Sequence, residues 1–195
     1  TGFLTFILNR KFPHKSFGIY CTVNFFVLLI CFLLNPFEKI GVVPSGGLGL
    51  DIIMRHALFA IHPPLIFIAY ASMAVLFSLA PAVRRAENTE IIRIVSLWVK
   101  ISLFFLGAGI LSGSIWAYHS MAWSSYWSWD PIQNVSLISY LILLGCYIED
   151  KYRSTSALIL PFIVCSFGSF LARSEVIEGF SRHLYIQSNV IINQF

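Results

Sequence analysis

Charged residues are the scarcest class in this sequence. They make up 11% of its 195 residues, whereas 57% are hydrophobic, and a soluble domain carries about 25% charged residues. The mean hydropathy is +0.78. The composition therefore indicates an integral membrane protein. The net charge of +4 comes from basic residues scattered beside apolar segments, which argues against nucleic acid as a partner.

Familiar catalytic arrangements are also missing from the sequence. We find no Ser-His-Asp set, no paired carboxylates, no P-loop and no metal-ligand cluster, so hydrolase and nucleotide-driven functions have no support. The apolar segments contain scarcely any ionisable residues, which argues against a solute transporter. The cysteines show no CxxC spacing and are interpreted as small buried hydrophobes rather than redox or metal groups; they are Cys21, Cys31, Cys146 and Cys165.

Five apolar segments are predicted to cross a membrane, because crossing takes roughly 20 apolar residues. The segment 134–148 is the shortest, but Asp130-Pro131 before it is a helix-start signal. The fold class is therefore all-α, a polytopic transmembrane bundle forming one membrane domain over 1–195. Because the chain begins without Met, we expect a fragment or a processed piece. The predicted spans are about 17–34, 64–82, 94–113, 134–148 and 155–172.

The basic residues set the expected orientation, since Lys and Arg gather on the inner side of a membrane. Eight of the 13 fall on one side, four on the other, and Lys100 lies within a span. The side with eight is predicted to be cytoplasm or mitochondrial matrix. The opposite side then carries a Gly-rich loop, the HPP motif at His62, the tail around His183, and the Trp-rich stretch 114–133.

That stretch includes WAYHSMAWSSYWSWDPIQ, which holds four of the five tryptophans. Indole rings suit a membrane interface, where they bury a flat face and keep a polar tip wet. We therefore predict that 114–133 is an external interfacial segment. Its aromatic faces form a platform on which a flat, apolar cofactor can rest.

Some residues near this segment are candidates for binding. His62, before Pro63-Pro64, is either a helix-capping residue or an axial ligand for haem iron, and His183 offers an opposite ligand. Arg173 either pairs with a propionate or anchors a helix at the interface. Asp130 caps the helix that follows it. His56 and His119 are interpreted as hydrogen-bonding or interfacial residues, and His14 as a solvated loop residue.

Three collinear motifs resemble one family. WAYHSMAWSSYWSWDPIQN is similar to the tryptophan-rich WWD motif of haem-handling membrane proteins, in the branch of the CcmF-type haem lyases. LNPFEKIGVVPSGGLGLDIIMRHALFAIHPPLIFIAY and GSFLARSEVIEGF resemble further stretches of that branch. The resemblance covers about 33–180. It implies a haem lyase of the system I cytochrome c maturation pathway, which works with a haem chaperone and an apocytochrome c bearing CxxCH.

The resemblance also implies roles for particular residues. His62 matches the first of two external histidines that flank the platform in the family. The second falls at Ser181 here, two residues from His183. The position of the histidine that ligates a stable haem b in the family is Ile148 here, which argues against a stable haem b in this chain. Serines stand at positions 124 and 125 of this chain, where the family has glycines in the platform. The residues matching the platform itself are Trp116, Trp123, Trp127, Trp129 and Asp130.

Two functions follow as expectations. In the first, the chain is a membrane subunit of a haem lyase and holds transient haem on the external face, with further lyase subunits, membrane lipid, the haem chaperone and apocytochrome c as partners. In the second, the chain is a catalytically inactive structural or assembly subunit of a larger, respiratory membrane complex. The sequence does not decide between these two functions, and therefore does not decide whether the chain is part of an active enzyme. The expected location is the mitochondrial inner membrane as part of a split lyase, with the bacterial plasma membrane as the alternative, and the Trp-rich segment faces the intermembrane space or periplasm.

Overall fold

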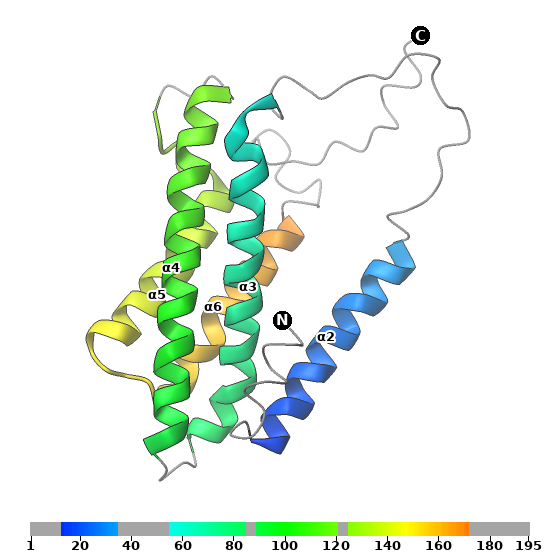
Figure 1. Ribbon diagram of the computed structural model, residues 1–195, viewed down its shortest axis with the longest axis vertical. Helices are drawn as coiled ribbons and strands as arrows, with labels where there is room; N and C mark the ends of the chain where they lie inside the picture. The colour runs from blue at the N-terminus through cyan, green and yellow to red at the C-terminus, as the bar shows by residue number, and fades with distance from the viewer. Residues whose placement is uncertain (1–12, 35–54, 85–88, 121–124, 172–195) are drawn as a thin grey trace.

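The computed structural model describes residues 13–34, 55–84, 89–120 and 125–171, and every regular element within these ranges is a helix (Figure 1). By length and composition the first four of the five helices can cross a membrane, whereas the last has 17 residues. The predicted all-α polytopic bundle is confirmed. The helices are α2 (His14–Leu34), α3 (Ala57–Val83), α4 (Thr89–Ser120), α5 (Pro131–Ile148) and α6 (Thr155–Leu171).

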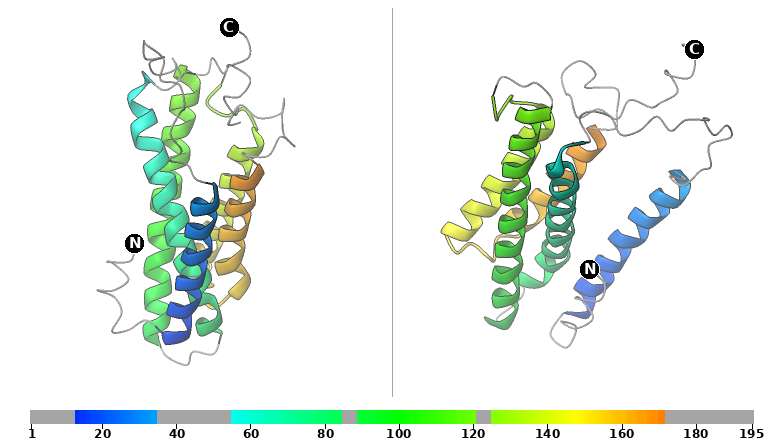
Figure 2. Two further views of the ribbon diagram at one scale, coloured as in Figure 1. Left: turned by 90° about the vertical axis from the view of Figure 1, so that its right-hand side faces the viewer. Right: turned by 45° about the horizontal axis from the view of Figure 1, so that its top comes forward.

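Helix α3 is the centre of the bundle. It packs against α4, α6 and α2, while α5 packs against α4 and α6. Figure 1 and the right view of Figure 2 show α2 slanting away from the other helices. Leu76 on α3 and Val99 on α4 are completely buried, and a hydrogen bond of 2.8 Å between the hydroxyls of Ser72 and Ser102 joins the two helices. A satisfied serine pair of this kind links helices in apolar surroundings, where a lone hydroxyl would be costly.

Large apolar side chains cover much of the outside of the bundle. Phe32 is 81% exposed on α2 and Phe104 is 68% exposed on α4. In water such a surface would drive aggregation, but the hydrocarbon of a bilayer covers it without cost. The exposed apolar surface and the buried serine pair therefore agree with a bundle built for a membrane.

The ends of the helices decide where a site can form. In Figure 1, α3 begins at the upper end, where α4 ends, and α2 and α6 run toward that same end. The loop 125–130 before α5 also lies there, so segments distant in sequence come together at one end of the bundle. This arrangement agrees with the predicted alternation of spans.

Two helix boundaries differ from the sequence predictions by seven residues, more than any other boundary. Helix α3 begins at Ala57 rather than 64, because His56 accepts a hydrogen bond from the backbone N–H of Leu58 and caps the helix; Pro63 and Pro64 lie in its second turn. Helix α4 continues to Ser120 rather than 113, so the first part of the predicted interfacial segment is helical. At 1.5 Å per residue its 32 residues span about 48 Å, beyond a hydrocarbon core of roughly 30 Å.

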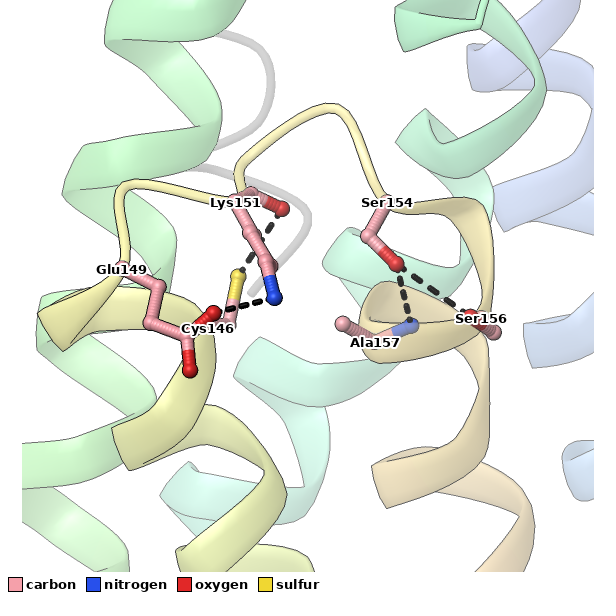
Figure 3. Close-up of polar contacts among 6 residues, drawn as sticks. All are labelled: Cys146, Glu149, Lys151, Ser154, Ser156 and Ala157. Atoms are coloured by element: carbon pink, nitrogen blue, oxygen red, sulfur yellow. Dashed lines mark hydrogen bonds and ion pairs between the residues drawn. The ribbon is translucent and has the colours of Figure 1, made fainter.

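The turn between α5 and α6 lies away from that end (Figure 1), and Figure 3 shows its polar contacts. The thiol of Cys146 donates to the carbonyl of Lys151 at 3.3 Å, and the ammonium of Lys151 pairs with Glu149. The hydroxyl of Ser154 accepts from the backbone N–H of Ala157 in the first turn of α6. Local hydrogen bonds therefore satisfy the polar groups of this turn and cap the helix that follows it.

Two glycines test the packing of α5 against α6. A Cβ at Gly168 would lie 2.4 Å from a methyl carbon of the stiff Val135 side chain, whereas a Cβ at Gly145 would meet nothing within 4 Å. We expect Gly168→Ala to lower the free energy of unfolding by about 1–3 kcal/mol through overpacking. Gly145→Ala should instead be neutral or raise it by up to about 1 kcal/mol. Thermal unfolding in detergent checks both, and equal effects would contradict this packing.

Candidate functional site at the aromatic end of the bundle

His62 lies where α3 and α4 come closest. It is the sixth residue of α3, and its Nδ1 lies 2.8 Å from the backbone carbonyl oxygen of Gly109 on α4. One turn further, a Cβ at Gly113 would lie 2.6 Å from Cε1 of the His62 ring. The imidazole therefore occupies space that only a glycine leaves open. We call Gly109 and Gly113 together the glycine cradle.

The cradle sets the proton position of His62. A carbonyl oxygen can only accept, so Nδ1 must be the donor. The neutral ring then carries its lone pair on Nε2. Metal-binding histidines have this same arrangement, with the other ring N–H held by a carbonyl or carboxylate. His62 is thus oriented as a ligand would be.

Trp116 joins His62 to the aromatic segment. It lies one turn beyond Gly113 on α4 and is 9% exposed. Its ring centroid lies 5.9 Å from that of His62 and 5.8 Å from that of Phe59. The extension of α4 past residue 113 is what brings this indole against the histidine.

The loop before α5 carries two further tryptophans. Trp127 and Trp129 meet edge to face with centroids 6.2 Å apart, and Trp129 is 71% exposed with a left-handed φ of 58°. Such a backbone is strained for a bulky residue, so the surroundings must hold it in place. The first turn of α5 supplies that hold, because Asn134 donates to the carbonyl of Trp129 and Gln133 accepts from Ser128.

Asp130 is the N-cap residue directly before α5 and is 5% exposed. Its carboxylate accepts a hydrogen bond from the backbone N–H of Ile132 at 2.9 Å. The predicted capping role of Asp130 is confirmed. Through this cap, the start of α5 and the strained loop are fixed relative to each other.

A small cavity of about 90 Å³ lies between α3, α4 and α5. Its lining includes Trp127, whose indole N–H is buried without a hydrogen-bond partner among the described residues. Small-molecule pockets usually measure about 300–1,000 Å³, so this cavity is too small to enclose a haem. A macrocycle can only approach His62 from outside. The polar groups of the lining come from His62, Tyr70, Ser114, Trp127, Gln133 and Ser136.

The outer surface of the same end presents stacked rings. Tyr118 on α4 stacks on Tyr126 of the loop, with centroids 4.3 Å apart and planes 23° apart. His56 stacks on His119 at 5.7 Å and 9°. The two histidines stack on each other at the surface of the protein, as expected for interfacial residues. Together with Trp129 they make this end an aromatic surface.

The predicted site residues fall into two groups. His62, Trp116 and Trp127 come together, with Trp129 and Asp130 beside them, whereas Trp123, Arg173 and His183 lie outside the described residues. Ile148 is the last residue of α5, which runs away from this end, and it is 70% exposed. Sequence reasoning missed the glycine cradle. The small-xxx-small spacing of Gly109 and Gly113 in an apolar span is the signal that finds it.

The fold and this site define a class of protein, a polytopic helical membrane protein with an oriented imidazole and a cluster of indoles at one end. The chain belongs to the cytochrome c assembly protein family, whose model matches residues 1–177. The resemblance to CcmF-type proteins seen in the sequence motifs is thereby confirmed.

Several curated relatives are similar to this chain. The cytochrome c-type biogenesis protein NrfE of Haemophilus influenzae is 32% identical over 88% of this chain and 29% of its own length. CycK of Rhizobium meliloti is 33% identical over 80% of this chain and 24% of its own, and CcmF of Escherichia coli is 30% identical over 78% and 25%. The chain thus spans about a quarter to a third of these relatives. No solved structure matches it.

Proposed function

We propose that this chain is a membrane subunit of a cytochrome c haem lyase. It holds haem, as substrate, at the aromatic end of the bundle while the haem is attached to apocytochrome c. Membership of the cytochrome c assembly family supports a role in cytochrome c maturation. We infer the binding of haem from the arrangement of His62 and the tryptophans.

The observation that carries this proposal is the hydrogen bond from His62 Nδ1 to the carbonyl of Gly109. It fixes the tautomer in which Nε2 bears the lone pair that iron needs. It also holds the ring in one orientation, which reduces the conformational entropy lost on binding a ligand. His62 is therefore the proposed iron ligand of this chain.

The aromatic residues supply contact with the flat macrocycle. Because the cavity beside His62 is too small for haem, the macrocycle lies on the outer side, against Trp127 and Trp129, while the buried Trp116 supports the His62 ring from within. From the sequence alone we propose Trp123 as a further haem contact, His183 as the opposite ligand and Arg173 as the partner of a propionate. This shallow placement suits transient binding and release.

The chemistry is an addition that needs no oxidant. The S–H bond of each apocytochrome thiol adds across a haem vinyl group, with sulfur forming the thioether and the proton going to the neighbouring vinyl carbon. The residues of this chain bind and orient the haem so that its vinyl edge is presented to the thiols. Apocytochrome c and a haem chaperone are therefore the proposed partners.

The remaining parts of the lyase belong to other subunits or to a longer chain, since the relatives are three to four times as long. We place the protein in the mitochondrial inner membrane, with the aromatic end facing the intermembrane space. The bacterial plasma membrane, with that end facing the periplasm, is the alternative location.

Depletion of the chain in its own cells tests the proposal. We expect covalently bound haem to disappear from c-type cytochromes while apocytochrome c persists. Haem staining after denaturing electrophoresis measures the first, and immunoblotting the second. If haem attachment were unchanged while a respiratory complex failed to assemble, the chain would be a structural or assembly subunit and the lyase proposal would be wrong.

A further inference from the structure

A basic groove lies along the first half of α4, toward the end of the bundle opposite His62. It has a volume of about 770 Å³, and its lining includes Arg93, Leu97 and Lys100. These three residues are exposed and follow i, i+4, i+7 spacing, so they share one face of the helix. The groove therefore presents two cations with an apolar residue between them.

Lys100 is a charged residue within a span. It lies eleven residues after Thr89, about 16 Å along the helix axis. An ionisable residue within a span is costly and calls for a polar partner. Its ammonium lies 5.9 Å from the centroid of the Tyr147 ring, which is a weak contact for a full charge.

The cations of the groove have no carboxylate partner in the part of the chain that the structure describes. The ion pair found there joins Lys151 to Glu149 instead. Glu90, the acid in the groove lining, is half-buried and has an interaction of its own. The groove therefore keeps an excess of positive charge toward its surroundings.

We propose that this groove binds the headgroup of an anionic phospholipid. The phosphate lies between the guanidinium of Arg93 and the ammonium of Lys100, and the hydroxyl of Ser96 is available to donate to it. An acyl chain runs along Leu97 and Phe104, which continue the same face of α4 and are 49% and 68% exposed. Basic pockets on the inner side of a membrane bind such headgroups, and this is the predicted inner side.

Lipid retention by the full chain tests this site. The protein is purified in a zwitterionic detergent, titrated with phosphatidylglycerol or phosphatidylcholine, and its bound lipid is counted by native mass spectrometry. We expect preferential retention of phosphatidylglycerol. The double variant Arg93→Gln/Lys100→Gln should weaken it roughly 25-fold, about five-fold for each removed charge. Arg93→Lys should keep most of the affinity.

Lys151→Gln is the matched control, because it removes one positive charge from the α5–α6 turn, where the ammonium already pairs with Glu149 (Figure 3). It should leave retention unchanged. Equal retention of the two lipids by the unmodified protein would overturn the proposal, and this comparison stands even if the double variant does not accumulate. An equal loss in Lys151→Gln, or equally tight binding of inorganic phosphate, would also overturn it.

Discussion

His62→Ala is expected to lower the yield of holocytochrome c by about 100-fold or more. Removing the residue that merely orients a metal ligand already costs roughly 10–100-fold, and this change removes the proposed ligand itself. Added imidazole should restore part of the yield, because it can fill the vacated space beside Gly113 and supply the missing nitrogen. Haem staining of the cytochrome c product measures both effects.

His56→Ala is the control for this change. It removes an imidazole from the same end of the bundle, but one that caps α3 and stacks on His119. We expect a loss of about 0.5–2 kcal/mol of stability from the lost cap and a near-normal yield of holocytochrome c. Unchanged yield in His62→Ala, or equal loss in both variants, would exclude His62 as the ligand.

Gly113→Ala is expected to reduce the yield by about 10–100-fold without removing any polar group. The new methyl group would lie 2.6 Å from Cε1 and 2.8 Å from Nδ1 of His62, closer than such atoms can approach. The ring must move, and its hydrogen bond to Gly109 breaks. The amount of folded protein in the membrane should change much less than the yield.

Gly107→Ala provides a comparison on the same helix. A Cβ there would lie 3.1 Å from a ring carbon of Tyr140, so a small shift accommodates it away from His62. We expect its yield to remain near that of the unmodified protein. If Gly113→Ala also kept full yield, the glycine cradle would have no part in the function.

Much of the fold follows from hydropathy alone. Long apolar segments can only be satisfied as helices in lipid, so the number and order of spans are recoverable from the sequence. Boundaries are harder, because they depend on caps. Pro63 and Pro64 suggest a helix start, but the histidine that caps α3 lies seven residues before Pro63, and a histidine is not among the preferred capping residues.

Part of the site can also be predicted from the sequence. Trp116, Trp127 and Asp130 stand out by residue type, and the HPP motif marks His62. The glycine cradle does not, because its importance comes from α3 and α4 lying side by side. A glycine in an apolar helix can serve many purposes. Only the position of the His62 ring in the structure shows that Gly113 leaves space for the imidazole.

Haem titration of the full chain in lipid nanodiscs tests the central claim most directly. The absorption spectrum should show iron with two imidazole ligands for the unmodified protein and for His56→Ala, and His62→Ala should lose one of the two and change the spectrum. A ligated spectrum that persists unchanged in His62→Ala would contradict the account, because the iron would then be held by another residue.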